Sequence, residues 1–166
     1  MEGSKILTLE LTTEQLFVQM KSQSYLIGEA LKSNPQLIEL AAKIQASDDD
    51  DEDLRDIINA GATKLGNLLS RVLGKTKYEW DTDHTKVTFT TNAVANFMDM
   101  QKGTLKDSML NYLSYYTLSK WLNLIKSDES GRFENLLREL EDDMRQLGAQ
   151  RDRPKRTSST PGSPSV

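Results

Sequence analysis

Apolar residues recur at spacings of three and four over residues 105–125 and lie on most sides of the helix they predict. A helix that is apolar nearly all round is buried nearly all round, so this segment is predicted to be the central helix of the domain. Lys106, Asp107 and Lys120 lie within it, which makes it a poor membrane span. The apolar positions are Leu105, Met109, Leu110, Tyr112, Leu113, Tyr115, Tyr116, Leu118, Trp121, Leu122, Leu124 and Ile125.

The first 46 residues are predicted to hold an extended segment and two helices. Residues 5–11 alternate in part and are rich in β-formers, so they are either a short strand or an extended lead-in. Thr12 and Gln15 have the spacing of a capping box and predict a helix from there to about residue 31. Pro35 suits the first position of a second, short helix.

Residues 47–148 are predicted to form a helical core. An acidic run precedes the periodic apolar segment 54–73, and carboxylates suit the N-terminus of a helix. Gly61 and Gly66 lie inside this helix, where they either permit the close approach of another helix or weaken it. A last amphipathic helix follows over about residues 128–147. The run contributes a candidate acidic face, made of Asp48, Asp49, Asp50 and Asp51.

A β-hairpin is predicted at about residues 77–91, between two long helices. Residues 77–80 and 86–90 have the pattern of strands, and residues 81–84 that of an Asp-rich turn. The hairpin is either local structure or a contact element, and its edge suits pairing with a strand of another chain. Its candidate contact residues are Tyr78, Trp80, His84 and Phe89. The predicted fold is thus mainly α: a bundle of about five helices with one inserted β-hairpin and an extended C-terminal tail.

Charge is unevenly distributed along the 166 residues, although the net charge is only −4. Residues 46–56 carry seven acidic residues and one Arg, whereas residues 149–166 form a basic tail rich in Pro and Ser. Such asymmetry indicates complementary contacts between copies or with other chains. The tail is too polar to order itself on a core of its own. It is either a terminus without a partner or an arm that docks on an acidic protein, and nucleic acid is the weaker alternative because no aromatics are interleaved. Its candidate binding residues are Arg151, Arg153, Pro154, Lys155 and Arg156.

No catalytic, cofactor or metal site is predicted. Counted from Asp48 as an EF-hand loop, the sixth position is Asp53 instead of Gly, and the twelfth is Asn59 instead of a carboxylate. His84 is the one histidine, and there are no cysteines. No Ser-His-Asp arrangement or Gly-rich phosphate loop is found, so we expect a protein that is not an enzyme. The aromatics of residues 112–121 are predicted to pack in the core, with one or two tyrosines facing a neighbouring subunit.

The order of these features resembles a known family. An acidic DDDDEDL segment leads into an amphipathic helix, followed by a hairpin, an aromatic helix ending in SKWL, a last amphipathic helix and an R-x-R-P-x-R tail. Residues 46–156 thereby resemble the head–tail connector proteins of tailed bacteriophages, also called adaptor or head-completion proteins. The similarity is greatest to versions carried by phages and prophages of Bacteroides-type bacteria.

The resemblance implies a structural role in the neck of the virion, after assembly in the host cytoplasm and without a membrane. Such proteins form a ring, often of twelve copies, below the portal protein. The tail would then be a portal-docking arm, and the hairpin would face a tail-side or neck protein or the DNA channel. The acidic face would meet an adjacent copy, or line a channel that passes DNA without binding its sequence. The alternatives are another phage neck or tail component, or a bacterial helical protein-binding module.

Overall fold

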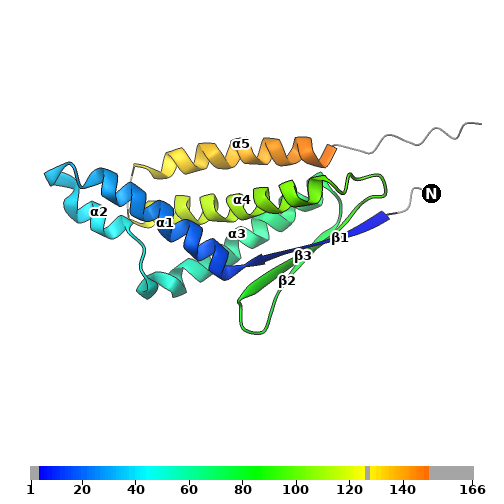
Figure 1. Ribbon diagram of the computed structural model, residues 1–166, viewed down its shortest axis with the longest axis horizontal. Helices are drawn as coiled ribbons and strands as arrows, with labels where there is room; N and C mark the ends of the chain where they lie inside the picture. Colours follow the sequence, from blue (N-terminus) through cyan, green and yellow to red (C-terminus); the bar gives the residue numbers. More distant parts are fainter. Residues whose placement is uncertain (1–3, 126–127, 150–166) are drawn as a thin grey trace, which may run out of the picture.

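The computed structural model of the chain describes residues 4–125 and 128–149. These residues form a mainly helical fold with one small antiparallel sheet, which confirms the predicted fold class (Figure 1). The basic tail lies outside the described residues. The elements are β1 (Ser4–Thr12), α1 (Thr13–Leu31), the 3-10 helix η1 (Pro35–Leu37), α2 (Ile38–Ile44), the 3-10 helix η2 (Asp48–Asp50), α3 (Asp51–Val72), β2 (Thr76–Trp80), β3 (Lys86–Val94), α4 (Gln101–Leu124) and α5 (Ser130–Ala149).

The sheet has three strands in the order β1-β3-β2, one more than the hairpin predicts. The N-terminal segment is a strand, since β1 pairs with β3 from Ser4 opposite Val94 to Thr12 opposite Lys86. The inner face of β1 carries leucines, which explains why its pattern alternates. Within the described chain, β1 and β2 each pair on one side only, so the sheet has two free edges.

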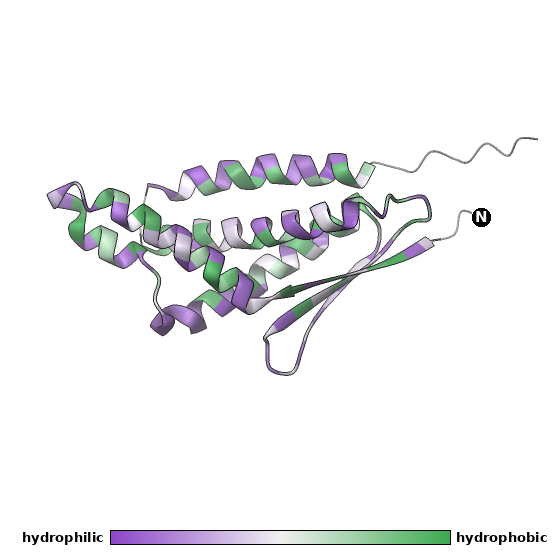
Figure 2. Cartoon of the chain, viewed as in Figure 1, coloured by the Kyte–Doolittle hydropathy of each residue, from purple (hydrophilic) through white to green (hydrophobic). Residues whose placement is uncertain are grey.

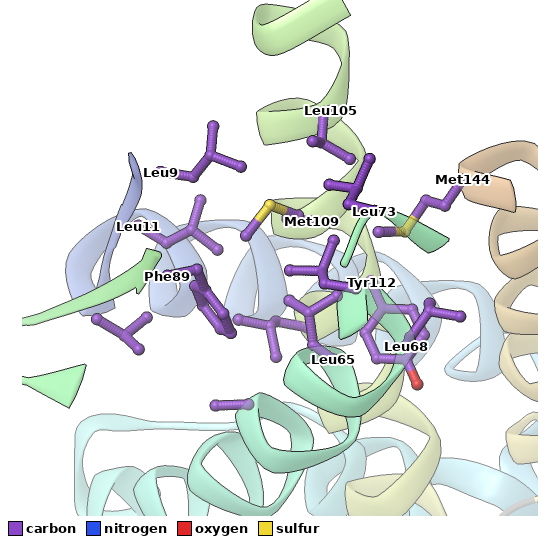
Figure 3. Packing of buried hydrophobic residues seen from close by; sticks show 14 of the residues in the cluster. Leu9, Leu11, Leu65, Leu68, Leu73, Phe89, Leu105, Met109, Tyr112 and Met144 are labelled. Carbon is purple, nitrogen blue, oxygen red and sulfur yellow. The ribbon is translucent and has the colours of Figure 1, made fainter. Parts of the chain in front are cut away.

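The core is built around α4, as predicted. Its first half lies against the sheet and α3, where Leu105, Met109 and Tyr112 share one buried cluster with residues of β1, β3 and α3 (Figure 3). Its second half enters another cluster, in which Leu118, Trp121 and Leu122 are buried. Residues of α1, α2, α3 and α5 complete this second cluster: Met20, Ile44, Leu54 and Phe133.

Helix α5 lies along the outside of α4 and has a narrow apolar side. Figure 2 shows hydrophilic residues along much of this helix and at the start of α3. Only Phe133, Met144 and Gly148 of α5 are buried. None of the described helices is long and apolar enough to span a membrane.

Candidate functional site

The structure brings three separate parts of the chain around one concave surface. The turn between β2 and β3, the first residue of α1 and the first turns of α3 enclose a hollow of about 270 Å³, which we call the turn hollow. A second, shallower hollow of about 740 Å³ adjoins it, sharing Thr13, Arg55 and His84. The turn hollow is lined by Thr13, Glu52, Arg55, Asp56, Ile58, Asn59, Trp80, Asp83 and His84.

Asp81 organises the turn that forms one rim of the hollow. Its carboxylate accepts hydrogen bonds from the Thr85 hydroxyl at 2.6 Å, the Thr85 backbone N–H at 2.7 Å and the Lys86 backbone N–H at 3.0 Å. These bonds, led by that of the Thr85 hydroxyl, lower the pKa of Asp81. His84 completes the turn with a φ of 53°, in the left-handed region.

Helix α1 holds this turn in place from its first residue. The Thr13 hydroxyl donates to the His84 carbonyl at 2.8 Å, and the Thr13 N–H donates to the Thr85 carbonyl at 2.8 Å. Thr12 caps the helix by accepting from the Gln15 N–H at 3.3 Å. The Gln15 side chain does not return a bond to Thr12, because the Thr12 backbone lies in the β1–β3 ladder, so half of the predicted capping box is formed.

Two of the predicted hairpin residues are anchored to α3. The Trp80 Nε1–H donates to Asn59 Oδ1 at 3.0 Å, and the hydroxyls of Tyr78 and Thr63 are 2.7 Å apart. The Trp80 ring also lies near the His84 ring, with centroids 5.9 Å apart. The indole therefore presents a fixed wall to the turn hollow.

Phe89 is a correction to the predicted contact set. Its side chain is fully buried in the main core, because β3 is the central strand and the residue faces the helices (Figure 3). It is therefore unavailable to a partner. The hairpin residues that lie at least partly at the surface are Tyr78, Trp80 and His84.

The acidic run forms a helix start, as its position predicts. Asp48, Asp49 and Asp50 make a 3-10 turn, in which the Ser47 N–H donates to Asp50 Oδ2 at 2.7 Å. Lys21 of α1 neutralises part of the run, since its Nζ lies 2.7 Å from Asp48 and 2.6 Å from Asp51.

These contacts shift the pKa values of Lys21 and Asp48. Burial opposes the charge of Lys21, but the hydrogen bonds that it donates to Asp48 and Asp51 outweigh this effect and raise its pKa. The hydrogen bond from Lys21 lowers the pKa of Asp48. Asp48 and Asp51 line the second hollow, beside the turn hollow.

The sequence predicts the hairpin and the acidic run as separate features and does not predict the contacts that join them. Thr13, Arg55 and Asn59 carry no motif, and they approach the turn only through the tertiary fold. One signal was present: residues 52, 55, 56 and 59 share a helix face by their spacing.

Within the described ranges, no group of three or more His, Asp or Glu side chains could hold a metal ion. The candidate arm residues Arg151, Arg153, Pro154, Lys155 and Arg156 lie outside those ranges. No protein-family model, curated protein or solved structure matches the chain.

Proposed function

We propose that this chain is a non-enzymatic structural protein whose copies assemble into a ring, the head–tail connector of a tailed-phage virion. The proposal combines the resemblance in the order of elements with the surface of the folded chain. In this role the helical bundle forms the wall of the ring, between the portal protein and the tail-side proteins. The virion neck would be its location.

The observation that carries the proposal is a pair of apolar surfaces on different helices. The first is on α1, where Val18 and Tyr25 lie two turns apart on one face. Their side chains are 65% and 54% exposed, and that of Leu26 beside them is 64% exposed. Large apolar side chains grouped at the surface mark a protein contact.

The second apolar surface is a groove of about 530 Å³ between α3 and α4. Ile57, Tyr116 and Leu124 line it, and the Leu124 side chain is 65% exposed. Two different surfaces on one subunit fit a heterologous contact, in which one surface of each copy meets the other surface of the next. Repetition of that contact closes into a ring when the rotation allows it.

Binding to the portal protein tests the proposal. The purified chain is mixed with the cognate portal ring and the product is viewed by electron microscopy. A second ring stacked on the portal is expected, and its loss on replacing Val18 and Leu26 by Asp would tie assembly to the α1 surface. Gln15→Ala, also exposed on α1, is the control and should leave the ring intact.

Failure to associate with the portal would contradict the connector role. A bacterial regulator would instead bind duplex DNA, with an affinity that falls steeply as salt is raised. That outcome, with no portal binding, would replace the proposal.

A further inference from the structure

The turn hollow has the features of a socket for a basic side chain. Glu52, Asp56 and Asp83 line it, and the carboxylate of none of them has an ion pair or hydrogen bond with another described residue. Trp80 supplies an indole wall whose orientation is fixed by its bond to Asn59. A guanidinium or ammonium group is attracted both to carboxylates and to the face of an indole ring.

The one Lys or Arg that lines the turn hollow does not fill this role. The Arg55 guanidinium lies over the Phe17 ring, 6.0 Å from its centroid, and makes no ion pair with a described residue within 4.0 Å. The adjoining hollow adds Glu14, Asp48, Asp51 and Asp81 against Lys21 and Lys86. The combined surface therefore keeps a negative excess that an incoming cationic segment would neutralise.

We propose that the turn hollow binds the basic segment of the C-terminal tail from a second copy of this chain. The segment carries Arg151, Arg153, Lys155 and Arg156, so its charge complements that of the hollow. The inference rests on the proposed assembly of copies and names a contact within it. It gives these residues a different partner from the portal, which the family resemblance implies.

The fold places the described end of α5 far from the turn hollow of the same copy. Gly148, near the end of α5, packs on Val72 at the C-terminal end of α3. The hollow lies at the other end of α3, and a helix rises about 25 Å over the 17 residues from Arg55 to Val72. Figure 1 shows the end of α5 and the hairpin turn at separate parts of the molecule.

The reach of the tail favours a neighbouring copy. An extended chain covers at most about 3.3–3.6 Å per residue, so Arg151 lies within about 11 Å of Gly148 and Arg153 within about 18 Å. Arg151 falls short of the hollow in its own copy, and Arg153 would approach only its near edge at Asn59. Lys155 and Arg156 would reach it only along a fully stretched chain, whereas a neighbouring copy can present its hollow to all four.

The hollow also adjoins a surface that the proposed ring would use. Asp56 lines both the turn hollow and the apolar groove between α3 and α4. The contact is heterologous, because tail and hollow are different parts of the chain.

Disulfide cross-linking between tagged and untagged copies tests the inference, and the absence of natural cysteines makes it clean. A tagged full-length chain carries Thr82→Cys beside the hollow, and an untagged chain carries Thr157→Cys in the tail. Cross-linked heterodimer should form about fivefold faster than with Asn67→Cys, a control at an exposed position farther along α3. Equal rates for the two positions would overturn the inference.

A charge swap then identifies the hollow as the binding surface. Glu52→Lys with Asp56→Lys in the tagged copy should slow cross-linking about fivefold, and the neutral pair Glu52→Gln with Asp56→Asn should slow it less. Arg153→Glu with Lys155→Glu in the other copy should restore the rate. Circular dichroism checks that each variant remains folded.

Other outcomes overturn this contact without deciding the connector role. Cross-linking that ignores the charge swap would exclude the hollow, even if rings still form on the portal. If reversing the tail charges abolishes portal binding while the hollow variants leave cross-linking unchanged, the tail binds the portal protein instead of the hollow. Conversely, restoration of cross-linking by the charge swap in a chain that does not bind the portal would support this contact and contradict the connector role.

Discussion

At the scale of single residues, the packing of α3 against α4 depends on Gly61. A Cβ built on Gly61 would lie 2.8 Å from Tyr116 Cδ1 and 3.2 Å from Leu113 Cδ2. Of the two roles open to this glycine from the sequence, close approach of another helix is the one the structure has. The ring it contacts belongs to the helix that the sequence places at the centre.

Gly61→Ala should lower the free energy of unfolding by about 1–2 kcal/mol, because overpacking outweighs the gain in helix propensity. Gly103→Ala is the matched control, since nothing lies within 4 Å of its Cβ and it is exposed in α4. That change should leave stability equal or higher. Urea denaturation measures both, and a stabilising Gly61→Ala would contradict the packing described.

The ionisation of Tyr112 should lower the free energy of unfolding at high pH. Burial of its phenol, together with the nearby Glu141 carboxylate, raises its pKa to about 12. The folded state therefore holds this proton more tightly than the unfolded state, whose tyrosine titrates near pH 10. The contribution to stability is present below pH 10 and is lost as the pH rises to about 12.

The comparison that isolates Tyr112 is the pH dependence of unfolding with and without its hydroxyl. The free energy of unfolding should fall more steeply between pH 10 and 12 in the natural chain than in Tyr112→Phe. Identical slopes would show that Tyr112 ionises equally in both states.

At the scale of elements, the helices could be predicted because the signal for each is local. Periodic apolar residues and the acidic start located α3, and the nearly all-round apolar pattern located α4. The partner of β1 could not be predicted, because Thr12 pairs with Lys86 across more than seventy residues and no local pattern records that pairing. The burial of Phe89 follows from the same pairing, which makes β3 the central strand.

The turn hollow was hidden for a related reason. Its residues come from α1, α3 and the β2–β3 turn, and a few hydrogen bonds made by Thr13 and Trp80 join these elements. Polar side chains on a helix face predict solvent exposure whether or not a hairpin lies opposite. The sequence therefore indicated the acidic surface and the hairpin, but not that the two lie side by side in the fold.

The hydrogen bond from Thr13 of α1 to the hairpin turn joins two elements, and its loss should lower the stability of the fold. Thr13 is buried, and Thr13→Val keeps its shape while removing the hydroxyl that donates to the His84 carbonyl. The free energy of unfolding should fall by about 1–2 kcal/mol. Thr8→Val, on the exposed face of β1, should change it by less than about 0.5 kcal/mol. Equal effects at the two sites in thermal denaturation would show that α1 does not hold the turn.

At the scale of the whole molecule, the described surface offers contacts on several sides of one helical bundle. The α1 face, the α3–α4 groove and the turn hollow are formed by different combinations of elements, and we propose that each is a contact between copies. Burial of apolar area at the first two would drive association, and charge at the third would fix its direction. This division of roles follows from the heterologous contact that we propose.

The mass of the purified chain in solution, measured alone and then with the cognate portal protein, tests the central claim of assembly most directly. We predict that subunits of 18.8 kDa join the portal as one stoichiometric ring, whether or not they form oligomers beforehand. A chain that keeps the mass of a monomer or dimer over a wide range of concentration, and leaves the mass of the portal unchanged, would contradict the connector account.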